Sequence, residues 1–206
     1  MRHVVRTIAD LPDGMKQQIN VTMNDREFNV VARNTILLLL ALTATETETL
    51  HIPSCTIAEA LIHVWYSASI PSDVLSLLQN RVKPLISDVC SKIANRPRNA
   101  TLGKTWEFSD GRSLRLILKK KDWFRLGNFL DIPDDMTLED TTQIRRAVTL
   151  APERSDYRDR WYFKDAFPFM RIAKQRFQED GLLIPFGHPR TRFNRPNPLV
   201  CPYIFD

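Results

Sequence analysis

An acidic residue follows a short alternating stretch near the start of the chain. The apolar residues of Ile19–Met23 alternate with polar ones, and Asn24-Asp25 comes immediately before a strongly apolar run. This pattern predicts a strand that ends at an acid and leads into a helix. In some α/β folds an acid at that point hydrogen-bonds a nucleotide ribose. The competing interpretation is that Asn24 and Asp25 cap the helix, with Glu27 completing a capping box.

A second group of residues is aromatic and basic. Aromatic side chains and arginine are the residue types that dominate binding energy at protein interfaces. The candidates for such a surface are Trp161, Tyr162, Phe163, Arg158 and Arg160, with Phe167 and Phe169 close by. Two alternatives stay open: the aromatic residues could wrap the core as a strap, and the arginines, with Arg154, could pair with Asp156 and Asp159.

Other common chemistries lack their residue patterns. No Ser-His-Asp, Cys-His, paired-carboxylate or phosphate-loop arrangement stands at a supporting spacing. The cysteines and histidines are scattered, which argues against a zinc site or a disulfide framework: Cys55, Cys90, Cys201, His3, His51, His63 and His188. His63 is expected to be a packed histidine. We therefore predict no catalytic residue and no metal ligand.

The charge is unevenly distributed. The net charge is +5, and residues 1–144 hold 17 basic and 17 acidic side chains. Residues 145–206 hold 12 basic and 7 acidic side chains, so the whole surplus lies there. Because acids are interleaved with these arginines, the pattern favours intramolecular ion pairs over a nucleic-acid surface.

The longest apolar run, residues 35–42, is too short to span a bilayer. The first residues also lack the continuous apolar region of a signal peptide. We therefore expect a cytoplasmic protein with no membrane partner.

The elements that must position these residues follow from periodicity. A helix over 2–10, a strand at Ile19–Met23 and a helix from about residue 26 suggest a parallel α/β layer. Further helices are expected at 57–67, 71–93, 122–130, 138–147 and 168–180, with Pro84 bending the second of these and Gly181 stopping the last. A strand is possible over 182–186, and an extended proline-rich end follows.

Asp110-Gly111 separates two alternating runs. Trp106 and Phe108 alternate before it, and three leucines alternate after it. This is a strong hairpin pattern.

Several stretches together resemble a known family. They are "MNDREFNVVARNTILLLLAL", "VWYSASIPSDVLSLL", "TWEFSDGRSLRLIL", "DYRDRWYF" and "RFQEDGLLIPFGHPRTRFNRPNP". In these stretches the chain resembles a fungal family of unassigned function, many of whose members carry a MYND zinc finger elsewhere. The family's domain is similar to the N-terminal region of dynein axonemal assembly factor three.

The resemblance implies a Rossmann-like parallel sheet related to class I methyltransferases. It places Asp25 at the acid that would hold the ribose of S-adenosylmethionine, with Arg2 and Asn24 as its neighbours at the site. Because no strand and no glycine loop precede residue 2, we expect a sheet without its first strand, truncated at its N-terminus relative to the family.

The sequence thus predicts a single Rossmann-like domain over 1–206, with residues 150–206 as a C-terminal extension packed on it. We expect a non-catalytic scaffold or assembly protein without a cofactor, which binds a protein partner and no nucleic acid. The alternative is an S-adenosylmethionine-dependent methyltransferase or its inactive remnant.

Overall fold

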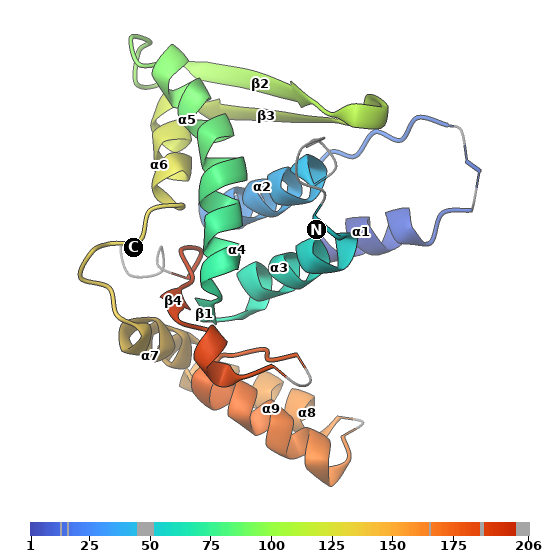
Figure 1. Cartoon of the computed structure of the whole chain (residues 1–206), viewed down its shortest axis with the longest axis vertical. Coiled ribbons are helices and arrows are strands. Elements are labelled where there is room, and N and C mark those ends of the chain that lie inside the picture. The colour runs from blue at the N-terminus through green and yellow to red at the C-terminus, as the bar shows by residue number, and fades with distance from the viewer. Residues whose placement is uncertain (13, 16, 45–51, 165, 186–187, 201–206) are drawn as a thin grey trace.

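The computed structural model describes the chain except residues 13, 16, 45–51, 165, 186–187 and 201–206. Most of the described residues are helical, and the strands form two separate antiparallel pairs. Figure 1 shows a layered body of helices under a β-hairpin, and an arm of three helices that projects from this body.

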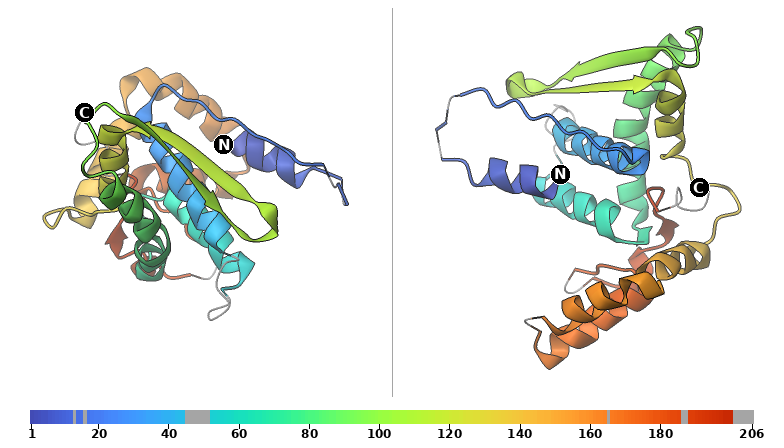
Figure 2. Two further views of the ribbon diagram at one scale, coloured as in Figure 1. Left: turned by 90° about the horizontal axis from the view of Figure 1, so that it is seen from above. Right: turned by 180° about the vertical axis from the view of Figure 1, so that it is seen from behind.

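Helix α1, Arg2–Ala9, matches the predicted first helix but buries none of its residues. The chain then runs back toward the start of α2 in extended form (Figures 1 and 2). The prediction of a parallel strand at Ile19–Met23 is wrong in this structure, because these residues pair with no other strand. The alternating apolar side chains consequently stay exposed: Ile19, Val21 and Met23 are 40–48% accessible.

The core is built on α2, Phe28–Thr43, and α3, Ser54–Tyr66, which pack against each other. A long helix crosses them and consists of α4, Ser72–Leu77, a π-helical turn, Leu78–Val82, and α5, Lys83–Lys92. The π turn lies directly before Pro84, whose ring nitrogen has no hydrogen to give to the preceding turn. Apolar residues of all these helices form one buried cluster.

The predicted hairpin is confirmed. Strands β2, Thr101–Glu107, and β3, Ser113–Lys119, pair antiparallel, and Gly111 takes a left-handed φ of 70° in the turn. Trp106 is buried and contacts Trp123 of α6, Lys120–Asn128, edge to face. The alternating leucines pack on the core from the other strand, as a half-buried strand requires.

The arm consists of α7, Leu138–Thr149, α8, Ser155–Phe163, and α9, Pro168–Asp180. A capping box begins α7, since the Thr137 hydroxyl and the Asp140 carboxylate each accept a bond from the other's backbone N–H. Helix α7 packs on α9, and α9 packs on α8. Helix α7 contacts β1 and β4 of the body, whereas α8 and α9 project away from the core in both Figure 1 and Figure 2.

After α9 the chain returns to the body. Strand β4, Arg195–Pro196, pairs antiparallel with β1, Ser69–Ile70, at the end of α3. Residues 182–185, predicted as part of a strand, belong to no strand. The described residues form no parallel sheet, and the Rossmann-like class stays a prediction.

Candidate protein-interaction site

Helices α8 and α9 form a hairpin that contains no buried residue. Pro168 occupies the first turn of α9, where its missing N–H breaks no hydrogen bond. Gly181 ends α9 with a left-handed φ of 70°, which confirms the predicted stop. The local sequence therefore favours two helices, and neither of them buries a residue against the rest of the chain.

The hairpin exposes large aromatic side chains. Phe163 is 61% accessible, Phe167 is 66% and Phe169 is 67%. Trp161 is exposed as well, whereas Tyr162 is half-buried. The interpretation that these residues wrap the core is therefore wrong for most of them, because the arm holds them away from it.

Cations on ring faces stabilise the hairpin. Lys174 lies 5.0 Å from the centre of the Trp161 ring and also donates to the Trp161 carbonyl. Arg171 lies 5.6 Å from the ring centre of Phe163. Such contacts use the negative face of the ring and require no acidic side chain.

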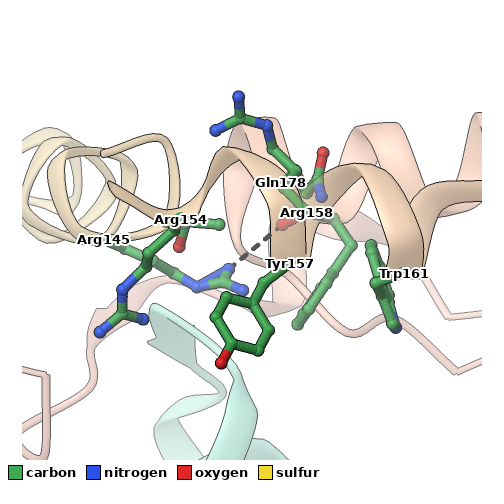
Figure 3. Close-up of a pocket in the computed structure, with 8 residues that line it drawn as sticks. Arg145, Arg154, Tyr157, Arg158, Trp161 and Gln178 are labelled. Carbon is green, nitrogen blue, oxygen red and sulfur yellow. Dashed lines mark hydrogen bonds between the residues drawn. The ribbon is translucent and has the colours of Figure 1, made fainter. Parts of the chain in front are cut away.

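An open pocket of about 240 Å³ lies between α7, α8 and α9 (Figure 3). Its basic and aromatic lining comprises Arg145, Arg154, Tyr157, Arg158, Trp161 and Phe177, with no acidic residue in the wall. Arg145 donates from Nη1 to the Phe177 carbonyl at 3.2 Å, and its guanidinium stacks 4.2 Å from the centre of that ring.

The pocket concentrates positive charge. Burial lowers the pKa of Arg145, an effect that the charge of Asp180 opposes. The Nη1 atom of Arg158 is buried and has no hydrogen-bond partner among the described residues. None of the three pocket arginines forms an ion pair in the described part of the chain. The pairing of Arg154, Arg158 and Arg160 with Asp156 and Asp159, which the sequence left open, does not occur among the described residues.

The structure brings together two of the five predicted interaction residues. Arg158 and Trp161 both line the pocket. Phe163 and Arg160 are exposed on the same helix outside the lining, and Tyr162 contacts Phe163 edge to face.

Arg145 and Tyr157 line the pocket as well, although neither is among the residues predicted from the sequence. Positions 154, 157, 158 and 161 stand at spacings of three and four, so their side chains share one face of a helix. That spacing was available in the sequence. The contribution of Arg145 was not, because α7 meets α8 and α9 only through tertiary packing.

The predicted cofactor residues do not converge. Asp25 accepts a hydrogen bond from the Glu27 backbone N–H at 2.9 Å, and Glu27 is the N-cap of α2 without a side-chain cap bond. The predicted capping box of Asn24 with Glu27 is therefore wrong, and Asp25 forms a local turn instead. Arg2 is exposed on α1, which lies far from the start of α2 in Figures 1 and 2.

A second polar cluster ties the C-terminal return to α3 and α4. Arg192 donates to Glu59 at 2.8 Å and to Asp73 at 2.9 Å. His63 is 1% accessible, shares a hydrogen bond of 3.2 Å with Glu59, and packs edge to face on Phe193. The prediction of a packed histidine is confirmed.

The same return is held by Asn197, which is completely buried. Its side-chain amide donates to the carbonyls of Val64 at 3.0 Å and Ser67 at 2.7 Å. Val64 lies in the last turn of α3 and Ser67 is the C-cap residue after it, where no further helical N–H is available to satisfy these carbonyls.

Within the described ranges, no three side chains of His, Cys, Asp or Glu are grouped so that they could hold a metal ion. Among the helices described, none combines the length and the apolar character needed to cross a bilayer.

Comparison with known families identifies one segment. Residues 1–70 match the model of a domain of unknown function, DUF4470. This segment contains α1, α2, α3 and β1, so the α8–α9 hairpin and its pocket lie outside the match. Neither the curated proteins nor the solved structures contain a match to the chain.

Proposed function

We propose that the protein is a non-catalytic scaffold or adaptor, and that its α8–α9 hairpin is the surface that binds a protein partner. The observation that carries this proposal is the exposure of Phe163, Phe167 and Phe169, each by more than 60%. Removing such rings from water on binding is favourable, and aromatic residues dominate interface energetics. Because no residue of α8 or α9 is buried in the chain itself, a partner that covers the hairpin would add apolar burial that the hairpin lacks.

The resemblance to a fungal family, and through it to an axonemal dynein assembly factor, supports a role in protein assembly in the cytoplasm. In this proposal the N-terminal segment is Rossmann-like and methyltransferase-like in ancestry but binds no cofactor. Ile19–Met23 keeps the alternation that would let it pair when a neighbouring strand is present.

Quantitative affinity capture with the tagged full chain tests the proposal. The triple substitution Phe163→Ser, Phe167→Ser and Phe169→Ser removes the exposed rings without touching the core. Phe124→Ser is the matched control, because Phe124 is also exposed but lies on α6. We expect specific partners to be lost with the triple variant and kept with the control. An identical set of captured proteins for wild type and triple variant would contradict the proposal.

A further inference from the structure

We infer that the pocket between α7, α8 and α9 binds an acidic peptide segment of the partner, with separate carboxylates held by Arg145, Arg154 and Arg158. This inference rests on the proposed function and specifies the chemistry of the partner. It depends on the charge of the pocket, its one unsatisfied donor, and a second pocket that adjoins it.

No acidic side chain lines the pocket, and the nearest acidic influence on it is the charge of Asp180, which acts on Arg145 from outside the wall. Three guanidinium groups line the pocket. Elsewhere in the described chain arginines do find acids, as Arg192 does with Glu59 and Asp73. The sequence also places its entire positive surplus in residues 145–206. A ligand with several negative charges is therefore complementary to this surface.

The pocket also holds an unused donor. Arg158 Nη1 is shielded from solvent and makes no hydrogen bond with any described residue. A buried guanidinium nitrogen without an acceptor is unfavourable, and a carboxylate supplies the strongest neutral-pH acceptor available from a protein.

The arrangement of the arginines favours several carboxylates over one phosphate. Figure 3 shows the guanidinium groups of Arg145, Arg154 and Arg158 lying apart from one another. A single phosphate would need them to converge on one point. Carboxylates spaced along a peptide can reach each guanidinium separately.

An adjoining pocket indicates which type of side chain the peptide carries between its acidic residues. It has a volume of about 160 Å³ and shares Arg145 and Thr149 with the first pocket. Apolar side chains such as Trp65, Val148 and Leu199 form much of its wall, and it too contains no acidic residue. This second pocket fits an aliphatic side chain of the same peptide.

Fluorescence anisotropy with a defined probe tests the inference. The probe is a rhodamine-labelled, C-terminally amidated hexapeptide, Glu-Glu-Leu-Leu-Glu-Glu, and the control peptide carries Gln in place of each Glu. We expect the acidic peptide to bind about tenfold or more tightly than the Gln peptide at low salt, with affinity falling as salt rises.

Matched arginine variants locate the site. We expect Arg154→Gln with Arg158→Gln to weaken binding by about tenfold or more, since two charge-assisted contacts are lost. Arg176→Gln removes the same type of charge from α9 outside the pocket lining, and we expect it to change the dissociation constant less than about twofold. Circular dichroism of each variant checks that the helices remain.

Three results would overturn the inference: equal affinity for the acidic and Gln peptides, equal loss in the pocket and Arg176 variants, or tighter binding of a phosphoserine peptide or of oligothymidylate. Loss of the captured partner in the Phe163, Phe167 and Phe169 variant, together with no binding of the acidic peptide, would refute this inference and leave the proposed function standing.

Discussion

At the scale of single residues, the carboxylate of Asp25 already has a hydrogen-bond donor in the neighbouring backbone. It accepts the Glu27 N–H in an exposed turn before α2. A ribose contact from one carboxylate contributes about 1.5–3 kcal/mol, and the rest of a nucleotide site comes from backbone donors and an enclosing pocket. Asn24 and Asp25 line neither the pocket between α7, α8 and α9 nor the pocket that adjoins it.

We therefore predict that Asp25→Ala loses about 0.5–1 kcal/mol of stability, the size of a local capping effect. Calorimetric titration should show no binding of S-adenosylmethionine or S-adenosylhomocysteine by the wild type. Micromolar binding that disappears in Asp25→Ala would instead restore the methyltransferase alternative.

Unlike the Asp25 carboxylate, the Nη1 atom of Arg158 has no hydrogen-bond partner among the described residues. We predict that Arg158→Met leaves stability unchanged or raises it by up to about 1 kcal/mol, because the buried Nη1 is removed and the apolar stem is kept. Arg171→Met is the control, since Arg171 donates to the Ala166 carbonyl and lies over Phe163. Urea unfolding should show a loss of about 1 kcal/mol for the control. A larger loss at Arg158 than at Arg171 would indicate a structural role for Arg158.

At the scale of elements, the arm meets the body at α7 and at the end of α9. The Gly181 carbonyl accepts the Ala68 N–H at 2.9 Å, just after α3. A Cβ atom at Gly181 would meet Arg145 Cδ at 2.5 Å and Ala68 Cβ at 2.9 Å. Gly181 thus combines a left-handed backbone with a close approach of two other elements.

We predict that Gly181→Ala lowers stability by about 2–4 kcal/mol, from the left-handed conformation and from the crowding together. Gly111→Ala is the control, because it has the same φ of 70° but no atom within 4 Å of its Cβ position. Gly111→Ala should lose only the part of the stability that comes from the left-handed backbone, about 1–2 kcal/mol. Chemical denaturation measures both variants, and equal losses would show that the contact with Arg145 and Ala68 does not matter. In an Arg145→Ala background the loss at Gly181 should shrink.

At the scale of the whole molecule, the C-terminal return closes the chain onto its first half. Asn197 satisfies the end of α3, and Arg192 bridges α3 and α4. His63 lies beneath this return, with Glu59, Asp73, Arg192 and His188 around it. The closure therefore depends on ionisable groups.

We predict that acid loosens this closure in two steps. Burial lowers the pKa of His63 below its usual 6.5 despite the hydrogen bond that Nε2 donates to the Glu59 carboxylate. The unfolded chain thus binds a proton at a pH where the folded chain does not, and stability falls as the pH drops below 6.5. For Asp73, burial raises the pKa, but the hydrogen bond and charge of Arg192 outweigh it and lower the pKa below 3.8. The contribution of Asp73 to stability is fully present above pH 3.8 and is lost as the pH falls through the folded-state pKa of Asp73.

Thermal unfolding between about pH 5 and 8 checks the first step. The wild type should lose stability toward pH 5, and His63→Gln should flatten this dependence. Parallel curves for the two proteins would contradict the assignment to His63.

Much of the local structure followed from the sequence alone. The hairpin at Asp110-Gly111, the stop at Gly181 and the helices with apolar periodicity depend on interactions between near neighbours, so short patterns specify them. The aromatic and basic character of the α8 surface, with Arg158 and Trp161 in it, was readable for the same reason. The capping box of Thr137 and Asp140 is equally local, and its spacing of three residues is visible in the sequence.

Only the tertiary structure decided how these elements meet. Ile19–Met23 has the alternation of a strand, but a strand requires a neighbouring strand for its hydrogen bonds, and the described chain provides none there. The exposure of Phe163 and the approach of Arg145 to α8 likewise depend on where α7 and α9 pack. Alternation and side-chain type are properties of a segment, whereas pairing, burial and convergence are properties of the distances between segments.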